Sequence, residues 1–313
     1  MRPAFSVILL TTLIGAGQGL FLALFAVEVL ARHGMIDNAP PWSFFFDAAL
    51  VAAALTLAGL VASFFHLGRP ERAWRTATKW KTSWLSREVI VLPLFLATLV
   101  LYALAHGMQS PRSTLIGAAA LVACVALFVC TGMVYACIRF LQEWASPLTL
   151  VNFALLGTAS GTSLAATIAA RGYDAPASGY AMAAIVLTTA GFATRVASLA
   201  RNARLRPKST LQSAIGVKHP QIEQKAQGFM GGSFNTREFF HGATAAKLRT
   251  VKLGFLALAF IVPIVLLAAG VLWQLPGSFA VAFVAQYAGL LAERWYFFAQ
   301  ANHPQNLYYQ AMS

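Results

Sequence analysis

Eight predominantly apolar stretches, each long enough to cross a lipid bilayer as a helix, divide the chain. The hydrocarbon core of a bilayer is ~30 Å thick and a helix rises ~1.5 Å per residue, so about 20 apolar residues span it. The last two stretches form one uncharged run from Leu253 to Ala292, in which Pro276 and Gly277 supply a turn. The predicted spans are residues 5–31, 44–67, 86–106, 113–140, 147–170, 178–200, 252–274 and 277–301. The sequence therefore predicts an all-α, polytopic integral membrane protein that forms one domain, residues 1–313.

The composition agrees with a chain that lies mostly in lipid. Hydrophobic residues make up 58% of the chain and charged residues 11%, against about 25% charged residues in soluble domains. Small residues recur within the spans, with Gly15, Gly17 and Gly19 in the first and Gly157 and Gly161 in the fifth. This spacing is typical of positions where membrane helices approach closely, so we expect these glycines to serve helix packing.

The distribution of basic residues predicts the orientation, because loops rich in Lys and Arg are retained in the cytoplasm. With eight spans, both termini share one side, together with the loop near 68–85 and the long loop 201–251. Of the 23 Lys and Arg residues, only Arg32, Arg112 and Arg171 fall in the loops of the opposite side. We therefore expect both termini and the 201–251 loop to be cytoplasmic.

The 201–251 loop is basic and contains a glycine-rich, aromatic segment at 228–242. One interpretation is a solvated surface that attracts anionic lipid headgroups, and the other is a segment folded on the helices or against a partner protein. The residues that we predict to contact the partner are Arg204, Arg206, Lys208, Arg237 and His241. Retention of basic loops in the cytoplasm already explains the charge, so the pI near 10.2 does not indicate nucleic-acid binding.

The cysteines and histidines do not predict a redox centre. Cys124, Cys130 and Cys137 lie on one predicted span without a CxxC pair, so no ligand set for an iron–sulfur cluster is present. A haem b between helices usually needs two histidines on facing spans, whereas all six histidines lie at predicted helix ends or in loops. We expect neither haem nor an iron–sulfur cluster in this chain.

A polar segment between the second and third spans is the strongest candidate for a functional site. It brings histidine, arginine, tryptophan and a carboxylate to the boundary of one leaflet, in a form suited to the carbonyl oxygens and ring of a quinone. A carboxylate there could relay the protons that quinone reduction consumes. The candidate residues are His66, Arg72, Trp74, Trp84, Arg87 and Glu88. The structural alternative is an ion pair of Glu88 with Arg87 or Arg72 that fixes the helix ends.

Two further pairs of ionisable residues lie in or near the spans. Glu293 and Arg294 fall inside the last span, about 100° apart on a helix, so each needs a partner elsewhere. A structural pair between helices is favoured there over a proton path. Glu28 and Asp47 lie near the opposite surface, where we expect them to be interfacial and solvated.

Three motifs resemble the membrane anchor subunits of the dimethyl sulfoxide reductase type. They are Phe-His-Leu-Gly-Arg-Pro-Glu-Arg-Ala-Trp at 65–74, Thr-Ser-Trp-Leu-Ser-Arg-Glu at 82–88 and Gly-Gly-Ser-Phe-Asn-Thr-Arg-Glu-Phe-Phe-His-Gly at 231–242. The eight-span plan extends the resemblance over nearly the whole chain. It implies a haem-free, quinone-binding subunit of a bacterial inner-membrane oxidoreductase. It ties His66, and less strongly Gly68, Arg72 and Glu88, to the quinone.

The partners implied by the resemblance are a four-cluster ferredoxin-like iron–sulfur subunit and a molybdopterin catalytic subunit, which carries the molybdenum site. The quinone would be ubiquinone or menaquinone. In dimethyl sulfoxide reductases the catalytic subunits lie outside the membrane, whereas here the quinone-site face carries the positive charge and should face the cytoplasm. This favours the sulfite-oxidising branch of the family. Other molybdoenzyme anchors that oxidise quinol are an alternative. A secondary transporter is a more distant one, because no internal repeat is evident.

Overall fold

The computed structural model describes residues 1–36, 39–65, 67–173, 175–223, 225, 239–304 and 306. Within these residues all regular structure is helical, and seven continuous helical segments are long and apolar enough to cross a membrane. They are α1 (Phe5–Arg32), α2 (Trp42–Phe64), α3 (Trp84–Gly107), α4 (Ser113–Ala136), α5 (Pro147–Ala169), α6 (Ala177–Ala203) and the run of α9 (Ala245–Leu256), η3 (Ala257–Ile261) and α10 (Val262–Leu272). The predicted all-helical membrane architecture is thereby confirmed.

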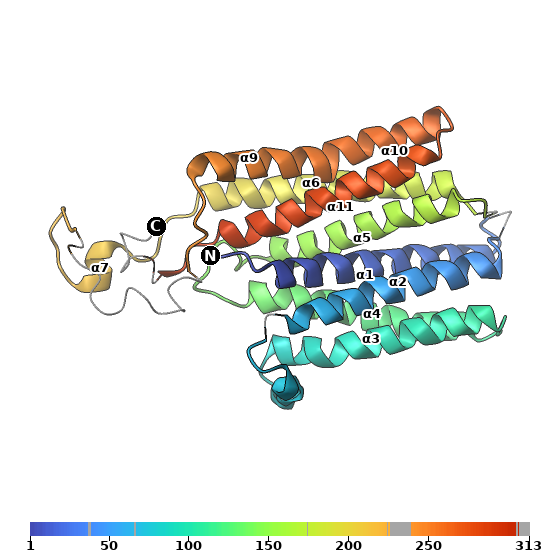
Figure 1. Cartoon of the computed structure of the whole chain (residues 1–313), viewed down its shortest axis with the longest axis horizontal. Coiled ribbons are helices and arrows are strands. Elements are labelled where there is room, and N and C mark those ends of the chain that lie inside the picture. The colour runs from blue at the N-terminus through green and yellow to red at the C-terminus, as the bar shows by residue number, and fades with distance from the viewer. Residues whose placement is uncertain are drawn as a thin grey trace.

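The helix α11 (Gly277–Ala299) corresponds to the eighth predicted span. It runs back along α10 in the bundle (Figure 1). Its polar residues Gln286, Glu293 and Arg294 lower its mean hydropathy, and it is not one of the seven segments above. The eighth span therefore stays a prediction. The end of the bundle where α1 begins and α11 ends is called the terminal end below, and the opposite end the distal end.

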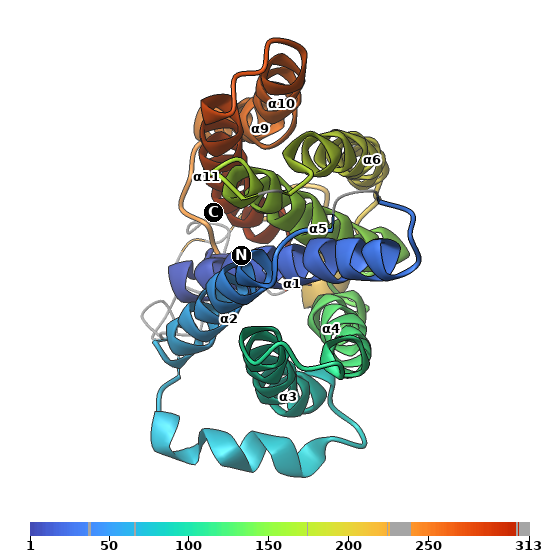
Figure 2. The ribbon, with the colours of Figure 1, turned by 90° about the vertical axis from the view of Figure 1, so that its right-hand side faces the viewer.

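Two short helices lie outside the bundle at the terminal end. The 3₁₀-helix η1 (Pro70–Lys79) connects α2 to α3 and lies across the direction of the bundle helices, in cyan in Figure 2. The helix α7 (Leu211–Ile215) follows α6 and projects beyond the bundle in Figure 1. The chain thus places both polar segments selected from the sequence at the same end.

The glycines of the first and fifth spans serve helix packing, as the sequence predicts, and the structure shows that these two spans pack on each other. Gly15 and Gly157 face each other, and a Cβ atom at Gly157 would lie 3.0 Å from the carbonyl oxygen of Gly15. A Cβ atom at Gly161 would overlap the backbone of α1 at Gly19 and Leu20. The backbones of α1 and α5 are therefore in direct contact, which only glycine allows at this crossing.

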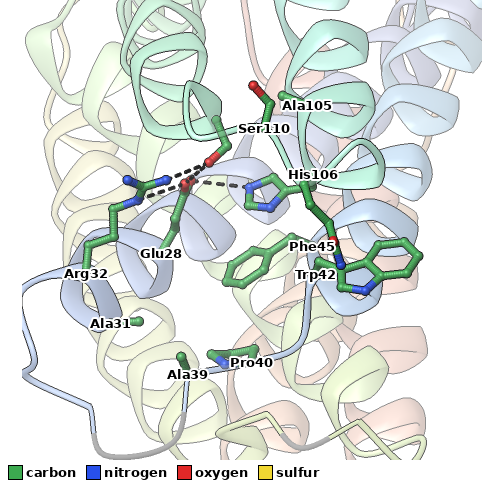
Figure 3. A pocket seen from close by; sticks show the side chains of 12 residues that line it. Glu28, Ala31, Arg32, Ala39, Pro40, Trp42, Phe45, Ala105, His106 and Ser110 are labelled. Atoms are coloured by element: carbon green, nitrogen blue, oxygen red, sulfur yellow. Dashed lines mark hydrogen bonds and ion pairs between the residues drawn. The ribbon is translucent and has the colours of Figure 1, made fainter.

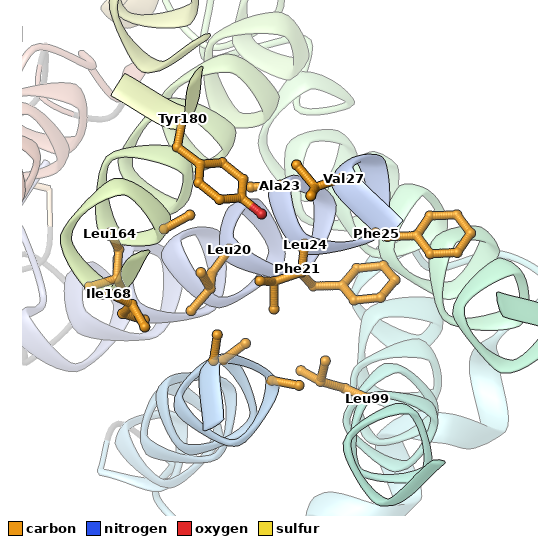
Figure 4. Close-up of a cluster of buried hydrophobic side chains, with 14 of the residues drawn as sticks. Leu20, Phe21, Ala23, Leu24, Phe25, Val27, Leu99, Leu164, Ile168 and Tyr180 are labelled. Atoms are coloured by element: carbon orange, nitrogen blue, oxygen red, sulfur yellow. The ribbon is translucent and has the colours of Figure 1, made fainter. Parts of the chain in front are cut away.

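Aromatic and aliphatic side chains fill the space between α1 and its neighbours (Figure 4). The ring of Phe21 packs edge-on against Tyr102 of α3, with 5.5 Å between centroids, and lies 5.9 Å from the ring of Phe25. Leu24 and Leu99 are fully buried in the same cluster. This apolar core lies on α1 between polar clusters at the two ends of the bundle.

A π-helical turn interrupts the α9–α10 run where α11 approaches it. Pro263 has no backbone N–H and its ring would clash with the carbonyl of Ala259, so an ordinary α-helical turn is unfavourable there. The η3 segment supplies the wider turn. Gly289 of α11 lies against this turn so closely that a Cβ atom would overlap the backbone of Ala259. Pro263 thus favours the wider turn against which α11 packs.

We predict that Gly161→Val strongly destabilises the protein, by more than about 4 kcal/mol, because its side chain must force α1 and α5 apart. Gly254→Ala is the matched control, since Gly254 lies within α9 with open space around it. The alanine should be neutral or should stabilise by up to ~1 kcal/mol. Thermal unfolding in detergent measures both changes, and equal effects of the two substitutions would contradict the packing argument.

Candidate functional site

Several of the residues predicted to bind quinone lie on the surface of the structure. His66 lies outside the described residues. Gly68 is exposed, with no atom within 4 Å of the position that a Cβ atom would take, and Trp74 on η1 is 66% exposed. Arg72 is also exposed on η1, where its Nε atom lies 3.9 Å from Oε1 of Glu71. The exposed aromatic and basic residues of η1 are typical of a segment at a membrane interface.

Trp84 and Arg87 do lie together at the start of α3. The side chain of Ser83 caps this helix by accepting a hydrogen bond from the backbone N–H of Ser86. The Arg87 guanidinium lies 4.2 Å from the centroid of the Trp84 ring. It also donates hydrogen bonds of 2.9 Å to the carbonyl oxygens of Trp80 and Lys81. Arg87 therefore fastens the turn after η1 to the beginning of α3.

Glu88 points into the bundle, in contrast to the exposed residues of η1. It is 7% exposed, and Thr131 of α4 donates a hydrogen bond of 2.6 Å to its Oε1 atom. Among the described residues Glu88 forms no ion pair, so the structural alternative with Arg87 or Arg72 is wrong. The N–H groups of Arg87 are directed to backbone carbonyls instead.

An enclosed cavity of about 10 Å³ lies between Glu88 and α1. Its polar lining residues are Thr11, Gln18, Glu88 and Thr131. A cavity of roughly 10–15 Å³ with several polar partners can hold one water molecule. The side chain of Gln18 is held by a hydrogen bond of 2.9 Å to the carbonyl oxygen of Cys124. Glu88 thus has one hydroxyl partner and a polar space next to it.

A second buried cluster joins α6 to α11 in the terminal half. Glu293 is 0% exposed, and its Oε1 atom lies 2.7 Å from Nε of Arg195. Its Oε2 atom lies 3.5 Å from Nε of Arg294. The expectation of a pair between helices is confirmed, but the expectation that Glu293 and Arg294 need separate partners is wrong. Both arginines share one carboxylate, because Arg195 approaches it from α6.

The positive charge of this cluster is stabilised by aromatic rings as well as by Glu293. The Arg294 guanidinium lies 3.6 Å from the centroid of the Phe153 ring, and that of Arg195 lies 5.6 Å from Phe255. Tyr135 of α4 packs on Phe153 of α5 at 5.4 Å between ring centroids and on Phe297 of α11 at 5.5 Å. Aromatic rings therefore connect α4 and α5 with the cluster on α6 and α11.

Glu28 at the distal end is buried, so the prediction that it is solvated is wrong (Figure 3). It is 4% exposed rather than solvated, because three hydroxyl groups and two basic side chains surround its carboxylate. Its partners are Tyr102 at 2.8 Å, Ser113 at 2.7 Å, Thr114 at 2.8 Å, His106 at 3.4 Å and Arg32 at 3.6 Å. Asp47 is exposed, as expected, and accepts a hydrogen bond from Tyr173.

An open pocket of about 310 Å³ adjoins this cluster between α1, α2, α3 and α4. Trp42 and Phe45 form its apolar wall, and the Phe45 ring stacks on His106 at 4.7 Å. An ionised carboxylate has about four acceptor positions, and the partners of Glu28 occupy them. The cluster therefore joins helices. The sequence signal for it was Glu28 four residues before Arg32 on one helix face.

The predicted docking residues lie where α6 leaves the bundle. Arg204, Arg206 and Lys208 are exposed, whereas Arg237 lies outside the described residues. His241 is partly buried, which lowers its pKa, and its Nδ1 atom accepts a hydrogen bond from the backbone of Ala243 at 3.0 Å. Of the 228–242 segment, only 239–242 is described.

Arg201 fixes the beginning of this loop. Its guanidinium donates hydrogen bonds of 3.1 Å to the carbonyl oxygen of Gln142 and of 3.2 Å to that of Ala145. These carbonyls belong to the turn between α4 and α5. The exposed basic residues that follow Arg201 are therefore presented from an anchored position at the terminal end.

Comparison with known proteins places the chain among membrane anchors. Residues 1–300 match the family described as DMSO reductase anchor subunit (DmsC). A sulfite dehydrogenase subunit of Allochromatium vinosum is 50% identical over an alignment of 326 residues, which covers 100% of both chains. The similarity therefore includes the hairpin with Trp84, Arg87 and Glu88, and the helices that carry Arg195 and Glu293.

We predict that Glu293→Gln destabilises the protein by about 3–5 kcal/mol, because two buried guanidinium groups lose their shared carboxylate. Arg195→Met should cost less, since Glu293 keeps Arg294 as a partner and the remaining pair is neutral. Thermal unfolding in detergent compares the two variants. A larger loss for Arg195→Met would show that charge balance does not govern this cluster.

Proposed function

The chain belongs to the family of DMSO reductase anchor subunits, and from this membership we propose that it is the quinone-reactive membrane anchor of a sulfite-oxidising molybdoenzyme complex. The observation that carries the proposal is the 50% identity over the full length of the sulfite dehydrogenase subunit. A relation of this extent supports the same place in the same kind of complex. The complex would be a sulfite:quinone oxidoreductase in which this subunit binds the quinone.

Membership of the family supports a division of roles among three subunits of the complex. The molybdenum site belongs to a molybdopterin catalytic subunit, and electrons reach the membrane through a four-cluster iron–sulfur subunit. The exposed residues Arg204, Arg206 and Lys208 at the terminal end support a docking surface for that partner. Quinone is ubiquinone or menaquinone, and its reduction to quinol takes up two electrons and two protons.

The quinone head group would lie where α2 ends and α3 begins. His66 directly follows Phe65 in the sequence and would hydrogen-bond one carbonyl oxygen of the quinone. Histidine can also give up a proton near neutral pH. Trp84, held under the Arg87 guanidinium, offers a flat face at the start of α3. Arg72 and Trp74 on η1 are exposed and would meet the head group from the surface of the bundle.

Glu88 suits the role of proton donor better than that of head-group ligand. It faces Thr131 and the water-sized cavity instead of the α2–α3 hairpin. A buried carboxylate with one hydroxyl partner and an adjacent polar space can hold a proton and exchange it through Thr131 or a water molecule. The proton lost by Glu88 would then be replaced from the cytoplasmic side.

The proposed topology has eight spans, with α11 as the eighth, and both termini in the cytoplasm. The pairing of Glu293 with Arg195 supports burial of α11 in the membrane, because intramembrane charges face partners inside the bundle. The 201–251 loop would then meet the catalytic subunits in the cytoplasm. This orientation separates the sulfite-oxidising branch from a dimethyl sulfoxide reductase anchor that oxidises quinol.

We predict that reporters fused after Ser313, or inserted within 208–220, are cytoplasmic, because basic loops are retained on that side. Two reporters distinguish the sides of the membrane: a fluorescent protein that is active in the cytoplasm and an alkaline phosphatase that is active in the periplasm. Periplasmic activity at either position would remove the argument from orientation for sulfite and favour the quinol-oxidising alternative.

We predict that His66→Ala lowers electron transfer to quinone at least about tenfold, which corresponds to ~1.4 kcal/mol in the barrier. Glu88→Gln should keep quinone bound but slow turnover, because glutamine cannot transfer the proton. Sulfite oxidation by a soluble artificial acceptor should stay unchanged in both. Glu71→Gln, which removes an exposed carboxylate of the same hairpin, is the matched control. A normal quinone rate in His66→Ala would place the site elsewhere.

A further inference from the structure

An apolar groove of about 580 Å³ runs between α1 and α2 in the terminal half of the bundle. Its lining residues are Ser6, Leu9 and Leu13 from α1, Ala54, Leu57, Ala58, Val61 and Ala62 from α2, and Phe65. Ser6 is the only polar side chain among them. The groove volume lies within the roughly 300–1,000 Å³ of typical ligand sites. Nothing in the head-group site described above uses it.

The groove forms because α1 and α2 are in close contact on one side, while small side chains leave space between them on the other. Gly17 approaches Thr56, and Gly59 approaches Ile14, so closely that a Cβ atom on either glycine would lie 2.6 Å from its neighbour. These contacts hold the helix backbones together. On the groove side, alanines spaced by four residues leave open space where larger side chains would fill it. The lining residues are Ala54, Ala58 and Ala62.

The groove is directed at the proposed head-group site. It extends along α2 from Ala54 to Phe65, about 16 Å at ~1.5 Å per residue, or half of a ~30 Å hydrocarbon core. Phe65 at its terminal end is 82% exposed and directly precedes His66. A chain lying in the groove would therefore leave it at the leaflet boundary, beside the hairpin that starts with His66.

We propose that this groove binds the prenyl tail of the quinone and guides its head group to the α2–α3 hairpin. A prenyl chain carries a methyl branch at every fourth carbon and rigid double bonds. Leu57 and Val61 alternate with small alanines along the groove. The space beside each alanine can take a methyl branch. A partly rigid chain also loses less entropy on binding. The inference rests on the proposed quinone reactivity and adds the part of the substrate that the groove recognises.

A phospholipid acyl chain is the competing occupant of the same apolar space. A straight acyl chain has no methyl branches to fill the space that Ala54, Ala58 and Ala62 leave open. The prenyl tail needs only apolar contacts there, since its polar ring lies beyond Phe65. The observations therefore favour the quinone tail, and the experiment below treats phospholipid as a separate outcome.

The test uses the three-subunit complex in nanodiscs with two quinones that share one ring, one long-tailed and one with the tail removed. Ala58→Trp fills the groove. Ala197→Trp is the matched control, because Ala197 is an exposed alanine that also lies six residues before the last residue of its helix. We expect Ala58→Trp to lower kcat/KM for the long-tailed quinone at least about tenfold. The tail-free quinone should change less than about twofold, and the control should change neither.

Assembly of each variant is checked by sulfite oxidation with a soluble acceptor. Should Ala58→Trp fail to assemble, Leu9→Ala, which removes groove contacts without adding bulk, should selectively raise KM for the long-tailed quinone. Equal rates of the wild type with both quinones, or equal effects of Ala58→Trp and Ala197→Trp, would overturn the inference. Loss of a co-purified phospholipid from Ala58→Trp with unchanged quinone selectivity would assign the groove to lipid. A wild type that oxidises sulfite but reduces neither quinone would instead refute the proposed function.

Discussion

The contact between the α1 and α5 backbones is the constraint on which the rest of the bundle depends. Gly157 and Gly161 leave no side-chain carbon at the crossing, so α5 lies directly on α1. Lipid provides no hydrophobic drive between helices, and close van der Waals packing has to supply the association. With α1 held in the middle of the bundle (Figure 2), its polar side chains reach neighbouring helices at two depths. Gln18, near the middle of α1, reaches α4, while Glu28 at the distal end reaches α3 and α4.

The two buried carboxylates near the ends of α1 differ in how completely they are satisfied. Glu28 has three hydroxyl donors and two basic neighbours, which together occupy its acceptor positions. Glu88 has one hydroxyl donor, Thr131, and a cavity the size of a water molecule. A saturated carboxylate costs a great deal to protonate, whereas a sparsely bonded one can gain and lose a proton. The physical contrast therefore favours a structural role for the distal cluster and supports the proton exchange proposed for Glu88.

The sequence predicted the helices and their packing better than the partners of the buried charges. Apolar length and the spacing of small residues are local properties of the sequence. The spans followed from the first and the use of glycines in helix packing from the second. Partners across the bundle are not local. Arg195 lies within a predicted span and is the natural counterpart of Glu293, yet only the fold shows that α6 and α11 meet at that depth. The solvated environment expected for Glu28 was wrong because hydroxyl groups on α3 and α4 enclose it. Helix order alone does not reveal such enclosure.

Charge balance links the two sides of the terminal half. Arg195, Glu293 and Arg294 together carry one net positive charge in their ordinary ionisation states, and an ionised Glu88 makes the array neutral. Phe153 links the two sites, because its ring lies 3.6 Å from the Arg294 guanidinium and also lines the cavity beside Glu88. In Figure 2, α3 and α6 lie on opposite sides of α1, with the α2–α3 hairpin beside one and the basic loop after the other. With Glu88 protonated these residues would carry a buried positive charge, whereas with Glu88 ionised they are neutral. Because buried charge is costly in a medium of low dielectric constant, the proton exchange proposed for Glu88 would be coupled to the charges on α6 and α11.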